Sequence, residues 1–451
     1  MNLSVIKNFM SRGNERTIKA KKNILASLLL KGCSMMISFM LIPLTLGYLN
    51  TYEYGVWLVL SSFMQWIDFF DIGLGNGLRN KLSESLAKND YEKGRIYVST
   101  TFVSLFIIVL LLYLLFYLIN FWIDWYQVLN VSPVIVSNLK TIILIVFCMM
   151  CLNFVFKTII YVYYAKQISM MSNLVTFLTQ VISFLAIYIL TKTTSGQLWK
   201  VALAYSLTPV IILLVSYPVT FFYKYRELSP SLLYFRKGYL RDLIGLGVEF
   251  FLLKIGALLI FATSNVIISR TLSPEEVTPY NIALKYFSIT TIAYSIITTP
   301  MWSAATEAYV KKDFIWLKKS SNSMLKIFLL ISSISILMVI FSEPIYRIWV
   351  GEKVLIPYNL TILLALYSIF VNLSTCYSTY LFGMGKIRMQ IWSTFVPGII
   401  FVFIAPYLAS LVGIQGVALA LVLVNVPSMI LNPIQFNILL SSSKHNKIWY
   451  K

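Results

Sequence analysis

Long, uninterrupted runs of apolar residues dominate the chain and are separated by short polar and basic segments. A helix needs roughly 20 residues to cross the hydrocarbon core of a bilayer, and about twelve runs reach that length. Membrane-spanning strands would alternate apolar and polar positions over about ten residues instead. The pattern therefore predicts an all-α integral membrane protein with spans over 24–43, 55–74, 97–118, 139–161, 173–191, 199–222, 244–268, 279–302, 325–342, 358–382, 391–409 and 415–440.

The basic residues predict how these spans are oriented. With the N-terminus in the cytoplasm, the cytoplasmic segments carry 27 of the 37 Lys and Arg residues, and the opposite side, helix margins included, carries 6. Cytoplasmic loops of membrane proteins are enriched in Lys and Arg, so we expect both termini in the cytoplasm. The basic N-terminal segment runs directly into a full-length span, without a small-residue cleavage site, and is interpreted as a tail rather than a signal peptide.

Composition agrees with the membrane assignment. The chain is 59% hydrophobic and only 12% charged, whereas soluble domains carry about 25% charged residues. The net charge of +20 could indicate nucleic-acid binding, but the basic residues lie in short clusters between apolar spans, which favours the lipid surface as their partner. The C-x-x-C of Cys148 and Cys151 lacks a second pair of ligands and lies in an apolar run, so we interpret both as buried apolar side chains.

The two halves of the chain are related by an internal repeat at a spacing of 223 residues. At this spacing "ESLAKNDY" at 84–91 aligns with "EAYVKKDF" at 307–314, and "VALA" recurs at 201–204 and 417–420 with a slightly shorter spacing. Six spans per half give both halves the same orientation, so the repeat is parallel. The repeat predicts two six-helix lobes with a central cleft: an N-lobe over 1–222, an amphipathic cytoplasmic linker over 223–243, and a C-lobe over 244–451.

Four lysines lie inside predicted spans, and they are the candidates for substrate binding: Lys31, Lys157, Lys254 and Lys285. A lysine at mid-depth costs about 2.5–3.5 kcal/mol, and such residues usually face a cavity. The spacing of 223 carries Lys31 onto Lys254, so the repeat predicts that these two cations face one cleft. The alternative is that the side chains reach the headgroups, which applies most to Lys157 and Lys285.

Three acids also lie in or at the ends of spans, and we interpret them as ion-coupling or charge-balancing residues. Asp68 and Asp71 are three residues apart, on one helical face. Glu249 lies five residues before Lys254, about 140° around the helix, so the two do not stack as a pair. The alternative for the aspartates is a helix-end contact with a nearby surface cation.

Several classes of enzyme lack their signatures in this sequence. No phosphate-binding P-loop, H-E-x-x-H motif or nucleophile elbow is present. "GLGNG" at 73–77 follows a predicted helix rather than a strand, so it is not read as a dinucleotide-binding loop. We therefore expect no cofactor, no metal and no enzymatic activity. A membrane-embedded polymerase or glycosyltransferase is the rival class, and it would normally carry a large loop rich in Asp, His or Arg.

Four stretches together resemble the polysaccharide-transport flippases of the O-antigen and capsule type. They are residues 41–90, "IYRIWVGEK" at 345–353, "YLFGMGKIRMQ" at 380–390 and "GIQGVALALVLV" at 413–424. These flippases belong to the multidrug/oligosaccharidyl-lipid/polysaccharide exporter superfamily. The resemblance covers nearly the whole chain, in the right order.

The resemblance implies two lobes that form a V and open alternately to either side of the bacterial cytoplasmic membrane. It also implies flipping of a polyprenyl-pyrophosphate-linked oligosaccharide to the outer leaflet, with H⁺ or Na⁺ as a coupling ion and with a polysaccharide polymerase and other assembly proteins as partners. Family members often place arginines in the cavity, where this chain has Lys31 and Lys254. The runner-up is a drug/cation antiporter of the same superfamily, for which we would expect a more acidic cavity.

Overall fold

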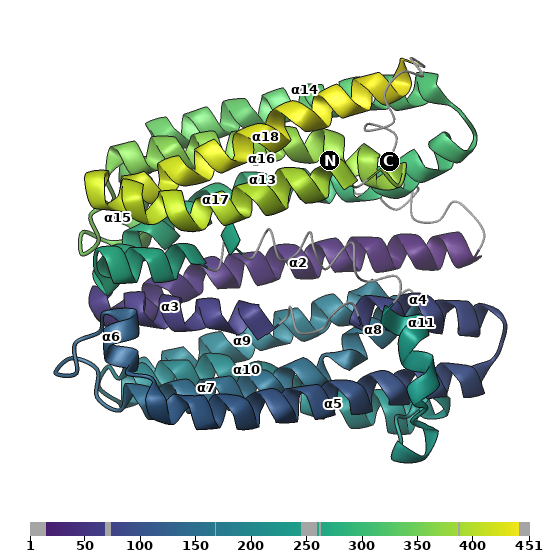
Figure 1. The fold of residues 1–451 in the computed structure, drawn as a ribbon, viewed down its shortest axis with the longest axis horizontal. Helices are drawn as coiled ribbons and strands as arrows, with labels where there is room; N and C mark the ends of the chain where they lie inside the picture. The colour runs from purple at the N-terminus through teal and green to yellow at the C-terminus, as the bar shows by residue number, and fades with distance from the viewer. Residues whose placement is uncertain are drawn as a thin grey trace. The chain divides into compact units, whose positions relative to one another are not determined.

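The computed structural model describes residues 15–67, 74–166, 168–244, 259–260, 263–386 and 388–441. Every regular element in these ranges is a helix, and none is a strand (Figure 1). The all-α class that the long apolar runs predict is therefore confirmed.

The helices form two compact units. In the first unit α2 packs along α9, and α7 packs against α5 and α10 (Figure 1). Its elements are α2 (Glu15–Tyr48), α4 (Leu74–Ala87), α5 (Tyr91–Trp122), α7 (Leu139–Phe156), α8 (Thr158–Ala165), α9 (Ser169–Thr193), α10 (Leu198–Pro218), η1 (Val219–Lys224), η2 (Arg226–Leu228), η3 (Leu232–Tyr234), η4 (Lys237–Tyr239) and α11 (Leu240–Ile244).

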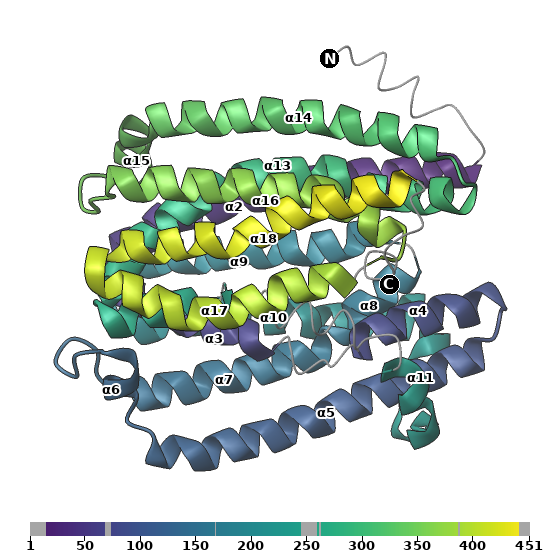
Figure 2. The same ribbon diagram turned by 45° about the horizontal axis from the view of Figure 1, so that its top comes forward.

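In the second unit α13 packs against α3, α14 and α16, and α18 packs against α16 and α17 (Figure 2). Its elements are α3 (Thr51–Ile67), α6 (Trp125–Leu129), a helical segment over 263–271, α13 (Pro274–Val310), α14 (Phe314–Ile340), α15 (Ser342–Val350), α16 (Tyr358–Gly383), α17 (Arg388–Val412) and α18 (Ile414–Leu440).

The helix α3 belongs to the second unit although it lies early in the chain. At Gly55 a Cβ atom would overlap the carbonyl oxygen of Pro274, so glycine permits this close approach of α3 to the start of α13. The Thr278 hydroxyl donates to the carbonyl of Thr51 at 2.8 Å. The lobe boundaries expected from the sequence, 1–222 and 244–451, stay a prediction.

Nine helices of the described ranges are long and apolar enough to cross a membrane, and they match nine of the expected spans. Many of their large apolar side chains are exposed, as on α5, where Leu111 is 61% and Leu118 is 60% exposed. Apolar residues directed outward on this scale fit lipid as the surrounding solvent. Of the other three expected spans, 55–74 and 244–268 reach residues outside the described ranges, and 279–302 lies within α13. The total of twelve stays a prediction.

The helix bounds recur at the spacing found in the sequence. Adding 223 residues to the first residues of α3 and α5 gives the first residues of α13 and α14. For α7 and α9 the spacing to α16 and α17 is 219, and for α10 to α18 it is 216. The offset shortens in steps across connections, which is where insertions and deletions are tolerated.

The turn that precedes α5 is repeated before α14 in atomic detail. The Asp90 carboxylate accepts from the N–H of Lys93, and the Asp313 carboxylate accepts from that of Trp316. The residue before each cap is left-handed, with φ of 57° at Asn89 and 58° at Lys312. The two turns thus have equivalent caps and equivalent backbone conformations, as a repeat of the two halves would require.

Candidate substrate-binding and coupling residues

The structure describes three of the seven candidate residues predicted from the sequence. Lys31 lies on α2 and is exposed, while Lys157 and Lys285 are partly buried, at the junction of α7 with α8 and on α13. Lys254, Asp68, Asp71 and Glu249 lie outside the described residues.

Lys31 belongs to a polar stripe along α2. Ser27, Lys31, Ser34 and Ser38 follow at intervals of four, three and four residues, and Thr45 continues the same face. Ser34 and Thr45 are buried, and the Thr45 hydroxyl shares a hydrogen bond of 2.9 Å with Tyr205 on α10. The stripe therefore turns toward the interior of the first unit at its far end and exposes Lys31 nearer its beginning.

The exposed apolar residues of α2 lie on a different face from Lys31. Leu29, Met36 and Met40 are each more than half exposed. At 100° per residue they are about 140–180° around the helix from Lys31. The ammonium group is thus separated from the apolar face of its own helix.

Helix α9 runs parallel to α2 and brings hydroxyl groups to the level of Lys31. Asn173 Nδ2 donates to the carbonyl of Ser27 at 3.5 Å, and the Tyr48 hydroxyl donates to that of Ser195 at 2.7 Å. The separations of 146 and 147 residues put Lys31 level with about residue 177 of α9. A row of hydroxyl side chains passes this level: Ser172, Thr176, Thr179 and Ser183.

Lys157 marks a break in its span. Its backbone N–H donates to the carbonyl of Asn153 at 2.8 Å, and its own carbonyl accepts from the N–H of Ile160, only three residues on, at 2.9 Å. The helix is therefore tighter in the first turn of α8. The helix then continues for eight residues, about 12 Å. A cavity-lining role for Lys157 stays a prediction.

Lys285 lies one helical turn beyond a buried amide network. Asn281 Nδ2 donates to Asn265 Oδ1 at 2.7 Å, and Asn265 Nδ2 donates to Ser62 Oγ at 2.7 Å. Ser62 and Asn265 are 1% and 8% exposed. The network joins α3, the helical segment 263–271 and α13 on the face of α13 that also carries Lys285.

A second polar network, among α16, α17 and α18, was not predicted from the sequence. Gln390 Nε2 donates to Gln435 Oε1 at 2.9 Å, and Asn432 Nδ2 donates to Ser374 Oγ at 2.9 Å. Gln390, Gln435 and Asn432 are all at most 3% exposed. The available signal was a stripe of polar residues within one apolar run, at Asn425, Ser428, Asn432 and Gln435.

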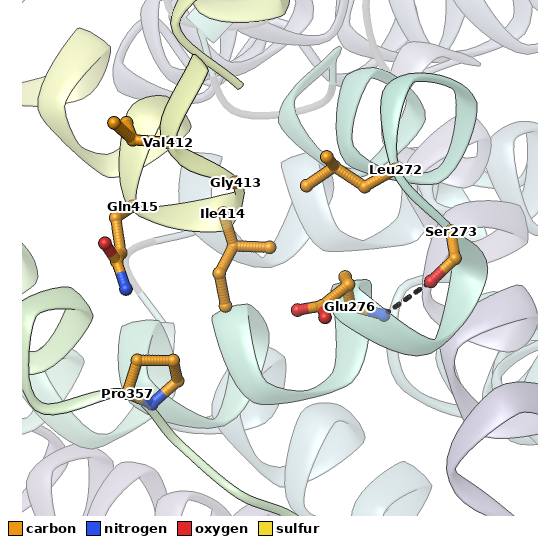
Figure 3. A pocket seen from close by; sticks show the side chains of 8 residues that line it. All are labelled: Leu272, Ser273, Glu276, Pro357, Val412, Gly413, Ile414 and Gln415. Atoms are coloured by element: carbon orange, nitrogen blue, oxygen red, sulfur yellow. Dashed lines mark hydrogen bonds between the residues drawn. The ribbon is translucent and has the colours of Figure 1, made fainter. Parts of the chain in front are cut away.

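A cavity of about 420 Å³ lies where α13, α16 and α18 begin (Figure 3). The Glu276 carboxylate points toward Ile414, and the Gln415 amide points toward Pro357. The N–H of Glu276 donates to Ser273 Oγ at 3.4 Å. Burial, together with the negative charge of Glu275, raises the pKa of Glu276, which precedes the expected span 279–302.

At the end of α4 the pKa of another glutamate, Glu84, is shifted in the opposite direction to that of Glu276. Lys81 and Lys88 lie 3.2 Å and 3.4 Å from the carboxylate of Glu84 and lower its pKa.

Among the residues that the structure describes, no group of three or more His, Cys, Asp and Glu side chains could hold a metal ion.

A family of polysaccharide biosynthesis proteins matches residues 20–306 of the chain. The chain belongs to this family. The matched range includes the polar stripe around Lys31, the amide network of Asn265 and Asn281, and Lys285. The resemblance found in the sequence is thereby confirmed.

Relatives of the family match most of the chain. A protein of Yersinia pseudotuberculosis named as an O-antigen export protein is 23% identical over 367 residues, covering 79% of this chain and 81% of the relative. A protein of Salmonella typhimurium named as an O-antigen transporter is 24% identical over 393 residues, covering 84% and 87%.

Solved transporter structures share the fold. The inward-facing conformation of a multidrug resistance MATE family transporter of the MOP superfamily superposes with a TM-score of 0.75 at 14% identity, covering 93% of this chain and 98% of that one. A MOP superfamily transporter from Pyrococcus furiosus gives a TM-score of 0.62 at 15% identity, covering 94% and 96%. This family member therefore has the fold of the MOP transporters. With nine apolar helices among its described residues and with its bacterial relatives, it is a multi-pass protein of the bacterial inner membrane.

Proposed function

We propose that this protein is a flippase that moves a polyprenyl-pyrophosphate-linked oligosaccharide, of the O-antigen or capsule type, from the inner to the outer leaflet by alternating access. The observation that carries the proposal is the match of most of the chain to relatives named as an O-antigen export protein and an O-antigen transporter. The family match and the MOP fold support the same conclusion. The chain acts as a transporter and not as an enzyme.

The polar stripe on α2 gives this function a physical basis. A diphosphate must cross about 30 Å of hydrocarbon, and its charge needs compensation on the way. Lys31 supplies a cation that is exposed, lies off the apolar face of its helix and is level with hydroxyl groups of α9. In the proposed mechanism Lys31 and its repeat equivalent Lys254 attract the diphosphate, and Lys157 and Lys285 add to the field.

The acids complete the proposed cycle. Asp68, Asp71 and Glu249 balance the cations or take up H⁺ or Na⁺, so that an ion gradient or the membrane potential drives the return of the empty carrier. We propose that both termini lie in the cytoplasm, and that a polysaccharide polymerase and other assembly proteins are partners of the flippase.

Reconstitution in proteoliposomes with a fluorescent lipid-linked oligosaccharide tests the proposal directly. We expect K31Q to lower the initial flipping rate roughly 10- to 100-fold, since a charge-assisted hydrogen bond is worth about 1.5–3 kcal/mol. K31R should keep most of the rate. The matched control is K93Q, which removes an exposed cation at the start of α5 and should flip normally.

One result would overturn the proposed function, and another would overturn its proposed mechanism. Wild-type protein that flips no lipid-linked oligosaccharide but exports a cationic dye would make the chain a drug/cation antiporter of the same superfamily. Normal flipping by K31Q and K254Q together would leave the function in place and remove the cations from its mechanism.

A further inference from the structure

The segment between η1 and α11 is hydrogen-bonded to the first turns of α5. Arg95 Nε donates to the carbonyl of Ser229 at 2.9 Å, and the N–H of Ser231 donates to Ser99 Oγ at 3.1 Å. Further along, the N–H of Arg236 donates to Thr100 Oγ1 at 3.2 Å. The backbone from 229 to 236 is therefore held beside α5 at both of its ends.

These contacts fix the depth of the segment along α5. Ser99 and Thr100 are buried and lie eight and nine residues after the first residue of the helix, about 12–14 Å along its axis. The apolar span predicted within α5 begins at residue 97. The segment thus lies at the level where the apolar part of α5 starts.

Between its hydrogen-bonded ends the segment exposes two adjacent leucines. Leu232 and Leu233, on the short helix η3, are 77% and 80% exposed. The ring of Tyr234 in the same turn packs against the Arg95 guanidinium, whose Cζ lies 4.2 Å from the ring centroid. The turn is held in place by its neighbours, and the leucines point away from them.

The charge around the leucines is strongly positive. Residues 223–243 contain five cations and two acids, and Lys166 on the first unit lies 3.5 Å from one of those acids, Glu227. All five cations are exposed: Lys224, Arg226, Arg236, Lys237 and Arg241. The terminal segments 1–14 and 442–451 also carry more cations than acids, so charge does not favour either as a cover.

We propose that Leu232 and Leu233 insert into the cytoplasmic leaflet and that the surrounding cations bind the headgroups of anionic phospholipids. An amphipathic surface at the interface gains both from apolar burial and from about 1 kcal/mol per cation near an anionic leaflet. The cytoplasmic side rests on the orientation proposed from the basic loops. Insertion itself does not depend on which lipid the protein transports.

Fluorescence quenching in proteoliposomes tests the insertion. The four native cysteines are replaced by serine, and a bimane label is attached to L232C or L233C, with K93C as the matched control. Lys93 is exposed and lies four residues, about 6 Å, before the first residue of the predicted span. We expect brominated phosphatidylcholine to quench the labels at 232 and 233 but not at 93, and aqueous iodide to quench only the label at 93.

The lipid preference is tested with the same labels. When all five cations of the segment are present, brominated phosphatidylglycerol should quench the labels at 232 and 233 at a lower mole fraction than brominated phosphatidylcholine. R236Q and K237Q should each lower this preference by about fivefold, the fold-change that corresponds to about 1 kcal/mol per charge. A charge change at the exposed Lys93, as K93Q, should leave it unchanged.

Three outcomes would overturn the inference. Equal quenching by iodide at 232, 233 and 93 would place the leucines in water. Protection of 232 and 233 from both bromolipids and iodide would mean that protein covers them. Equal quenching by the two lipids would remove the headgroup preference. None of these results bears on whether the protein flips lipid-linked oligosaccharide, which the transport assay decides separately.

Discussion

Replacing Asn265 by leucine removes the central member of the amide network that joins α3 to α13. Asn265 accepts one hydrogen bond of 2.7 Å from Asn281 and donates another of 2.7 Å to Ser62. Leucine is similar in shape and can form neither bond. The substitution therefore tests whether polar bonds between helices hold the second unit together.

The structure sets the size of the effect. The Ser62 hydroxyl also donates to the carbonyl of Leu58 at 2.9 Å, and Asn281 Nδ2 donates to that of Val277 at 2.8 Å, so each partner keeps a hydrogen bond after the substitution. Hydrogen bonds between membrane helices average about 0.6 kcal/mol and reach about 1.7 kcal/mol. Asn265 Nδ2 also lies 3.3 Å from the carbonyl of Leu58 and 3.5 Å from Asn281 Oδ1. Counting only the two bonds of 2.7 Å, we expect N265L to lower the free energy of unfolding by about 1.2 kcal/mol, and by no more than about 3.4 kcal/mol.

Unfolding by SDS in mixed micelles, followed by far-UV circular dichroism, measures this free energy. The matched control is N425L, because Asn425 Nδ2 donates to the carbonyl of Leu421 within its own helix, α18. In a double-mutant cycle with S62A we expect a coupling energy of about 0.6 kcal/mol. No coupling between Ser62 and Asn265, or an equal loss in N265L and N425L, would refute the reasoning.

Three further predictions follow from packing, capping and charge. G77A should lower the free energy of unfolding by about 1–3 kcal/mol because the new Cβ would overlap the backbone of α11. G32A should not lower it, because a Cβ at Gly32 would have no neighbouring atom within 4 Å. SDS unfolding of both variants separates the effect of overpacking from that of helix propensity. D90A and D313A should each cost about 0.5–2 kcal/mol, equally within error, and a large difference between them would contradict equivalent caps. The pKa of Glu276 is raised, so the folded state binds this proton more tightly than the unfolded state. The resulting stabilisation is fully present below the ordinary glutamate pKa and is lost as the pH rises through the raised value. Thermal midpoints measured against pH should show this decline in the wild-type protein and should not show it in E276Q.

Hydropathy in the sequence was sufficient for the fold class, and the family came from the resemblance of four stretches to known flippases. Long apolar runs predicted the membrane helices, because each span must contain its own backbone hydrogen bonds and its own apolar surface. The spacing of 223 between equivalent residues predicted helix bounds that recur at that spacing, down to the caps formed by Asp90 and Asp313. Local sequence decides these features because a cap or a turn depends on residues within a few positions.

The sequence also named Lys31 and Lys285 as unusual, since a cation is costly wherever it lies within a span. It did not reveal what surrounds them. The polar stripe of α2 lies level with the hydroxyl row of α9, some 146 residues later in the chain, and the partners of Asn265 come from α3 and α13. Apolar periodicity also gave no hint that Gln390 pairs with Gln435. Only tertiary packing decided these partners, because a polar side chain in a membrane helix bonds to whichever neighbouring helix the fold brings to its level.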